Sequence, residues 1–188
     1  YWSPTGRLPV SWPAAVGQMP IYYAERPTGR PADPANHYTS KYSDAPVAPQ
    51  FPFGHGLSYA RFSYRDLRVA PAVLQPGDQF TVTAAVTNDG PAADEETVLL
   101  FIRDPVASVS RPVLELKAAT KLSLSPGEQA TATFHLGTDA FTFLGLALEP
   151  VLEAGIFELF VGPRADPAVL LKATVRLQDA PGPGPSHA

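Results

Sequence analysis

The chain has 188 residues, of which 45% are hydrophobic, so it is long enough for one ordinary domain with an appendage. Its formal net charge of −4 excludes the strongly basic balance that marks nucleic-acid-binding domains. It has no cysteine, which excludes disulfide bonds and thiolate metal sites, and no apolar run reaches the roughly 18 residues of a membrane span.

Residues 1–50 are predicted to be extended and irregular. Turn formers dominate this segment, as in "ERPTGRPADPANHY", and its one convincing strand covers residues 8–12. Such a segment cannot offset a chain-entropy cost of about 1–2 kcal/mol per ordered residue, so we expect it to lean on another body. It opens "YWSPTGRLPVSW" without a methionine, and we expect it to be a piece of a longer polypeptide.

Residues 51–61 are predicted to form a mechanical joint. A phosphate-binding glycine loop would need a strand before it, a helix after it and a further glycine, and here proline precedes and strand-like sequence follows. Glycines allow a sharp change of direction, and aromatic rings grip neighbouring bodies. The candidate joint residues are Phe51, Phe53, Gly54, Gly56, Leu57 and Tyr59. We expect their side chains to fill a seam with a body outside the chain, so that Phe53→Ala would leave the domain after the joint nearly untouched.

Short runs of alternating polarity begin at Phe62. In "QFTVTAAVTN", one face collects Phe80, Val82, Ala84 and Val86. Further strands are predicted at residues 98–102, 113–124, 130–136, 156–161 and 169–177. Seven or so strands at this spacing predict an all-β, immunoglobulin-like two-sheet sandwich. The last residues, "DAPGPGPSHA" (179–188), are expected to be a disordered tail.

Two turns are predicted in detail. "LQPGDQ" (74–79) and "LSPGEQ" (124–129) both place proline and then glycine where a type II turn needs them. Each turn is expected to lead into a strand.

Catalytic chemistry finds little support in these residues. The densest acidic cluster is Asp94-Glu95-Glu96, in which only Asp94 and Glu96 could share a face of a strand, and we expect it to be a solvated loop. The four histidines lack metal-like spacing, and no Gly-x-Ser-x-Gly elbow occurs. We therefore assign no catalytic, cofactor or metal residues. Arg111 is expected to form a structural ion pair with Glu115 or Asp104.

Five tyrosines of the first sixty residues could stack on sugars or could seal an interdomain seam. They are Tyr22, Tyr23, Tyr38, Tyr42 and Tyr59. We favour the seam, because aromatic side chains dominate such contacts.

An ordered series of motifs resembles family 3 glycoside hydrolases of the β-glucosidase and β-xylosidase kind. "GRLPVSWPAAVGQMPIYY", "TGRP", "YTSKYSD" and "FPFGHGLSYARFSY" look like the end of that family's α/β/α sandwich domain and the connector after it. "VTNDG", "FIRD", "RPVLELK" and "KLSLSPGE" are similar to its C-terminal fibronectin type III-like domain. The chain departs from the family's usual residues at His55, Leu99 and Ala118-Ala119, where tyrosine, glutamine and Gly-Phe are common.

The resemblance implies a domain plan. Residues 1–50 would be the extended remnant of the α/β domain, 51–61 the joint, 62–178 the fibronectin type III-like domain and 179–188 the tail. The upstream catalytic domains of the same parent chain would be its partners, and they would supply an aspartate nucleophile and a glutamate acid/base. Neither motif can be found in this sequence.

The parent would be an exo-acting retaining β-glycosidase without a cofactor, acting on β-linked glucosides or oligosaccharides in the periplasm or outside the cell. This chain alone would be inactive. The alternative function is an independent carbohydrate-binding or adhesion module with the same immunoglobulin-like fold.

Overall fold

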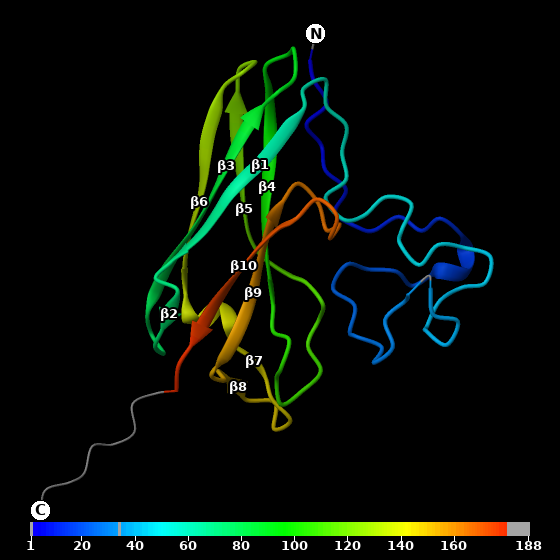
Figure 1. Ribbon diagram of the computed structural model, residues 1–188, viewed down its shortest axis with the longest axis vertical. Coiled ribbons are helices and arrows are strands. Elements are labelled where there is room, and N and C mark those ends of the chain that lie inside the picture. Colours follow the sequence, from blue (N-terminus) through cyan, green and yellow to red (C-terminus); the bar gives the residue numbers. More distant parts are fainter. Residues whose placement is uncertain (1, 34, 180–188) are drawn as a thin grey trace, which may run out of the picture.

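The computed structural model describes residues 2–33 and 35–179, and it contains a β-sandwich with a long irregular segment beside it (Figure 1). One sheet has three strands in the order β1-β3-β6, which are Phe62–Ala70, Gln79–Asn88 and Gln129–Gly137. The other has the order β2-β10-β9-β4-β5, which are Val73–Leu74, Leu171–Leu177, Gly155–Gly162, Asp94–Arg103 and Glu115–Leu124. Every pairing is antiparallel except that of β10 with β2. The predicted all-β two-sheet sandwich is confirmed.

The core lies between the two sheets because alternate residues of the long strands point inward. The predicted face of β3 is fully buried, and β4 and β9 contribute Leu100 and Leu159 opposite it. A short 3₁₀ helix, η2 (Thr138–Phe141), follows β6 and inserts Phe141 into this core. The Phe141 ring stacks on Phe80 and Phe157, with centroid distances of 5.3 and 4.2 Å. This ring stack closes one end of the sandwich.

Both proline-glycine turns have the predicted geometry. Asp78 N–H donates to the Gln75 carbonyl at 3.0 Å across the first turn, and Glu128 N–H donates to the Ser125 carbonyl at 3.0 Å across the second. Their glycines, Gly77 and Gly127, have φ values of +92° and +75°, which a side chain would disfavour. The turns lead into β3 and β6.

Several predicted strand boundaries need correction. The strand expected from residue 113 begins at Glu115, and the one expected from residue 169 begins at Leu171. Residues 8–12 do not form a strand, and only Trp12 makes an isolated bridge, to Phe51. The N-terminal segment otherwise contains one short 3₁₀ helix, η1 (Val16–Gln18), among its described residues. Of the predicted tail, residues 180–188 lie outside the part of the chain that the structure describes.

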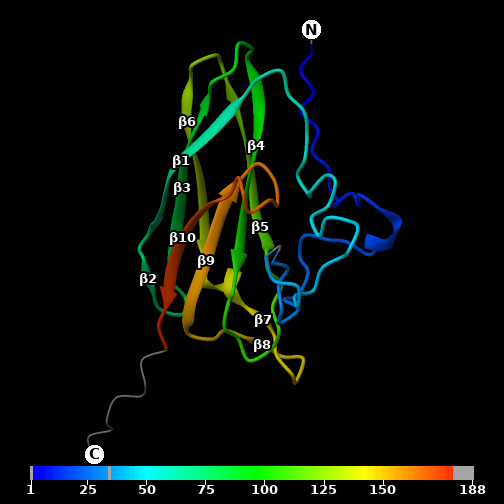
Figure 2. The ribbon, with the colours of Figure 1, turned by 45° about the vertical axis from the view of Figure 1, so that its right-hand side comes forward.

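The N-terminal segment runs along the outer face of the five-stranded sheet and loops outward before it returns to enter β1 (Figure 2). Strand β4 is consequently covered on both faces, and its run "VLLFI" (98–102) is buried throughout. A continuous apolar run of this kind is typical of a strand with neighbours on both sides. The body on which the segment leans is therefore the sandwich of the same chain.

Candidate interdomain joint

A second apolar cluster fixes the N-terminal segment to the outer face of the five-stranded sheet. Leu99, Phe101 and Leu114 are its buried members, and Tyr23 and Phe53 pack against them from the segment. The Tyr23 ring lies 4.4 Å from Phe53 and 5.8 Å from Phe101, between ring centroids. Phe53 is therefore anchored on the sandwich, and the expectation that its side chain fills a seam with a body outside the chain is wrong.

Two glycines allow close backbone approaches, Gly54 to the sandwich and Gly56 to the outgoing part of the N-terminal segment. A Cβ on Gly54 would lie 2.8 Å from Leu99 Cδ1 and 2.9 Å from the Pro163 carbonyl oxygen, and its φ of +83° also favours glycine. A Cβ on Gly56 would lie 2.3 Å from the Gly6 carbonyl oxygen. A side chain at either position would push the connector away from its neighbours.

Backbone hydrogen bonds bind the two halves of the segment together and to the sandwich. Trp12 and Phe51 exchange bonds of 2.7 and 3.2 Å. Leu8 N–H donates to the His55 carbonyl at 2.9 Å, and Ala165 N–H, in the turn between β9 and β10, donates to the Phe53 carbonyl at 2.8 Å. The joint is thus part of an ordered backbone network.

A buried ion pair adds an electrostatic tie. Arg7 Nη2 lies 2.5 Å from Glu96 Oε2, and their side chains are only 13% and 4% exposed. Tyr64 on β1 donates its hydroxyl to Glu96 Oε1 at 2.7 Å. Burial and the Glu96 charge both raise the pKa of Tyr64 far above its usual range, so its proton stays available for this bond. Glu96 therefore connects the segment, β4 and β1.

Asp94, two residues before Glu96 on the same face of β4, makes a second polar contact with the segment. It accepts hydrogen bonds from the hydroxyls of Ser3 and Ser58, which lie on the outgoing and returning ends of the segment. Burial by itself would raise the pKa of Asp94, but these bonds and one from the Glu95 N–H hold it below its usual value. The expectation of a solvated acidic loop is therefore wrong for Asp94 and Glu96, which share a buried face because β4 begins at Asp94.

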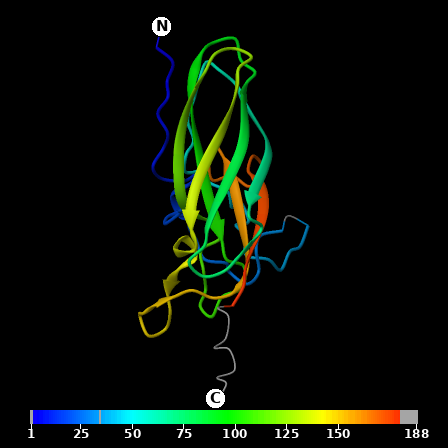
Figure 3. The same cartoon turned by 90° about the vertical axis from the view of Figure 1, so that its left-hand side faces the viewer.

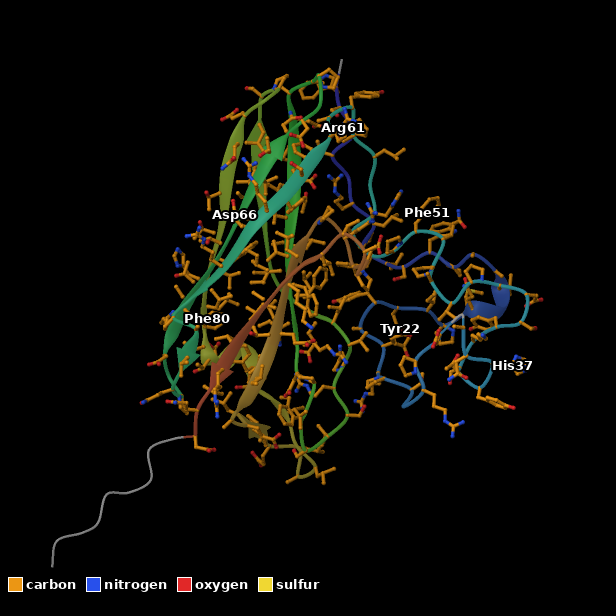
Figure 4. The ribbon with its side chains drawn as sticks, in the orientation of Figure 1. Tyr22, His37, Phe51, Arg61, Asp66 and Phe80 are labelled. Atoms are coloured by element: carbon orange, nitrogen blue, oxygen red, sulfur yellow. The ribbon has the colours of Figure 1, made fainter. Side chains whose placement is uncertain are left out.

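Other members of the predicted joint point outward. Leu57 and Tyr59 are 72% and 64% exposed, and Phe51 and Trp12 are also exposed. Trp12, Phe51, Leu57 and His55 line an open, mainly apolar hollow of about 560 Å³. Figure 4 shows Phe51 on the stretch beside the sandwich and His37 on the loop that extends away from it. The joint therefore has one face buried on the sandwich and one face free.

The tyrosines of the segment divide in the same way. Tyr23 packs in the second apolar cluster, whereas Tyr22, Tyr38 and Tyr42 are exposed. The His55 ring packs against Phe51 in a tilted arrangement, with centroids 4.6 Å apart. Burial and the nearby Arg164 and Arg7 charges lower the pKa of His55, so the ring is uncharged at neutral pH.

Arg111 has the structural role that its sequence context indicated. Its guanidinium pairs with Glu115 and lies 4.4 Å above the centroid of the Phe143 ring. Asp104 is buried near it and has one carboxylate oxygen without a hydrogen-bond partner. Burial raises the pKa of Asp104 above its usual value.

The described residues hold no group of three or more histidine, aspartate or glutamate side chains placed to bind a metal ion. Within the same residues, no helix has the length and apolar character needed to cross a membrane.

Sequence reasoning missed Arg7, Ser3 and Ser58 as partners of the acidic cluster. Their separations from Glu96 and Asp94 are 89, 91 and 36 positions, so no local pattern links them. The apolar run "VLLFI" indicates a cover on the outer face, which Tyr23 and Phe53 supply, but it does not indicate these polar partners.

Comparisons with known proteins agree with this architecture. Residues 96–165 match the fibronectin type III-like domain family. The periplasmic β-glucosidase of Salmonella typhimurium is 38% identical over 163 residues, which is 86% of this chain and 21% of the relative. A β-xylosidase of Formosa agariphila is 36% identical over 93% of this chain and 24% of the relative.

Solved structures give the same result. A β-glucosidase from Listeria innocua in complex with glucose superposes with a TM-score of 0.85 at 37% identity, covering 94% of this chain and 24% of the neighbour. A GH3 β-glucosidase from Bifidobacterium adolescentis superposes with a TM-score of 0.62 at 35% identity, covering 69% of this chain and 19% of the neighbour. The chain therefore spans about a fifth to a quarter of the length of the relatives that it matches.

Proposed function

We propose, from the chain's membership of the C-terminal part of family 3 glycoside hydrolases, that it is the structural end of a retaining β-glycosidase and has no catalytic pair of its own. The observation that carries the proposal is the use of its buried carboxylates. Asp94 accepts hydrogen bonds from Ser3 and Ser58. Glu96 pairs with Arg7 and accepts a hydrogen bond from Tyr64. Both carboxylates therefore fix the N-terminal segment to the sandwich.

The proposed domain plan is the one that the family resemblance implies. Residues 1–50 would belong with the preceding α/β body, 51–61 would form the joint, 62–178 the fibronectin type III-like domain and 179–188 the tail. Phe53, Gly54 and Gly56 would seat the joint on the sandwich, whereas Phe51, Leu57 and Tyr59 would meet the preceding body.

Such an arrangement suits the chemistry of the proposed parent. A retaining glycosidase needs a nucleophile and an acid/base about 5–5.5 Å apart, and a misplacement of about 1 Å can lower the rate about a hundredfold. A segment tied at both ends to a rigid sandwich limits the motion of whatever is attached to it. We infer that the module stabilises the domains that contain the two carboxylates and supplies no reacting group.

The substrate class and location are also proposals. The relatives named above are β-glucosidases and a β-xylosidase, and one of them is periplasmic. These names support a parent that cleaves β-linked glucosides or oligosaccharides in the periplasm or outside the cell.

Reading the gene upstream of the first codon of this chain tests the proposal. An in-frame barrel domain with an aspartate nucleophile is expected there. A start codon or a signal peptide directly before Tyr1 would contradict the proposal and favour an independent carbohydrate-binding or adhesion module.

A further inference from the structure

A leucine-rich hairpin projects from the far end of the sandwich. Strands β7 (Phe143–Leu144) and β8 (Pro150–Val151) form it, and Figure 3 shows it standing clear of both sheets. Leu144, Leu146 and Leu148 are 61%, 89% and 78% exposed, so nothing in the described chain covers them. Three exposed leucines within five residues form a concentrated apolar tip.

The backbone conformation at the tip is unfavourable for a leucine at position 148. The turn closes through bonds of 3.0 Å from Leu148 N–H to the Gly145 carbonyl and from Gly145 N–H to the Glu149 carbonyl. Leu148 adopts a φ of +59°, a left-handed conformation in which glycine or asparagine is favoured.

Elsewhere the described residues follow that rule. The other positive φ values belong to Gly29, Gly54, Gly77, Gly127 and an aspartate. A strained, exposed leucine has no benefit within this chain, and local strain of this kind is found where a side chain serves a function. We take Leu148 as a sign that the tip is used for contact.

The base of the hairpin is linked by a chain of contacts to the N-terminal segment. Phe143 lies under the Arg111 guanidinium at its base, and Ser108 N–H donates to Glu153 at 2.9 Å just beyond β8. The loop that contains Ser108 and Arg111 is in turn bonded to the segment, through Val113 N–H and the Glu25 carbonyl at 2.8 Å. Val106, on the same loop, is 83% exposed. One path of contacts therefore leads from the segment to the tip.

The charge and the contact area of the tip indicate which partner could cover it. The only ionisable residue in 143–151 is Glu149, and Glu153 follows it, so the tip lacks the basic residues by which proteins bind anionic lipid surfaces. A stable contact between two copies needs roughly 800 Å² from each, supplied by about 20–30 residues, far more than one hairpin tip. A large body already fixed at the joint needs only a small additional contact.

We propose that the hairpin tip, formed by Leu144, Leu146 and Leu148, packs against the body that precedes residue 1 in the same polypeptide. This contact is a second attachment, separate from the joint, and it rests on the proposed function. It would stop the sandwich from pivoting about the joint.

Hydrogen–deuterium exchange of the 188-residue chain and of the longer polypeptide tests this contact. Amides of residues 143–151 are expected to exchange at least ten times more slowly in the longer polypeptide. In that polypeptide, the double variant Leu146→Asn/Leu148→Asn should restore the fast exchange of 143–151. In the 188-residue chain, the same variant should leave the melting temperature unchanged or raise it, since the leucines contact nothing there and asparagine tolerates the left-handed turn. Val73→Thr, at a half-exposed position of β2 where threonine suits a strand, is the control and should change neither readout.

Exchange of residues 51–61 in the same samples separates the two proposals. Protection gained at 51–61 but not at 143–151 would overturn the hairpin contact and leave the proposed function standing. Protection gained at neither site would contradict both. Protection of 143–151 in the 188-residue chain that grows with protein concentration, or on addition of anionic phospholipid vesicles, would overturn the occupant proposed here.

Discussion

Arg7 and Glu96 form a buried ion pair across 89 positions of sequence, with Nη2 and Oε2 2.5 Å apart. The pair joins the irregular N-terminal segment to strand β4, which lies between β9 and β5. Tyr64 satisfies the second oxygen of the carboxylate. Removing either charge would leave the other buried without its opposite charge, a change that strongly destabilises a fold.

We predict that Arg7→Met lowers the free energy of unfolding of this chain by about 3–5 kcal/mol, since Glu96 would remain buried and charged. Lys121→Met provides the matched control, because Lys121 pairs with Glu95 at the surface and such pairs contribute about 0–1 kcal/mol. Chemical denaturation followed by tryptophan fluorescence and circular dichroism measures both. Equal losses in the two variants would mean that the Arg7–Glu96 pair is not the tie described here.

Phe53→Ala should destabilise the chain even without any preceding domain. Full burial of a phenylalanine is worth about 3–5 kcal/mol on truncation, and the partly buried Phe53 should cost somewhat less. Leu57→Ala, four residues later and largely exposed, should cost less than 0.5 kcal/mol, roughly the scale of surface substitutions. Melting temperatures of the two variants decide the question. A neutral Phe53→Ala would show that the second apolar cluster does not support the joint.

The ties at Asp94 predict a dependence of stability on pH. The folded protein holds the pKa of Asp94 below its ordinary value of 3.8, so its contribution is present above that value and is lost as the pH falls through the folded pKa. Wild-type protein should therefore lose more stability below about pH 4 than Asp94→Asn does.

Asp104 provides the contrast, because burial raises its pKa. Ionised Asp104 destabilises the fold above its folded pKa, and this cost is relieved as the pH falls through that pKa towards 3.8. Relative to Asp104→Asn, wild-type protein should gain stability over that window. Denaturation curves at several pH values give both signs, and the same sign for both residues would contradict the assignment.

Limited proteolysis should cut first in residues 26–44, where most residues are exposed. Residues 3–23 and 46–61 carry the hydrogen bonds, ion pair and ring contacts to the sandwich, so they should resist cleavage together with 62–177. Mass spectrometry of the early fragments gives the order. Loss of the whole segment before any cut at 26–44 would show that the seam is not stable in solution.

Local chemistry made the sandwich predictable. Phe80, Val82, Ala84 and Val86 alternate on β3, and each Pro-Gly pair needs the positive φ that Gly77 and Gly127 show. The contacts between the N-terminal segment and the sandwich could not be predicted in the same way. The partners meet only after the chain has folded, and the exposure expected for Asp94 and Glu96 was reversed by Ser3, Ser58 and Arg7 from distant positions.

The joint at residues 51–61 stays a prediction, and the sequence did not indicate which of its side chains would face the sandwich. Aromatic side chains at Phe51, Phe53 and Tyr59 carry no sign of which neighbour each will face. Phe53 turns to the sandwich because Gly54 and the small residue Ala165 let its backbone approach there. Tyr59 has no such neighbour and stays exposed.

Hydrolysis of 4-nitrophenyl β-D-glucoside, measured side by side for this chain and for the longer polypeptide, tests the central claim most directly. We expect turnover by the longer polypeptide and none by the 188-residue chain, because Asp94 and Glu96 are engaged by Ser58 and Arg7. Turnover by the 188-residue chain that survives repurification, and that Asp94→Asn or Glu96→Gln abolishes in a protein that is still folded, would contradict it.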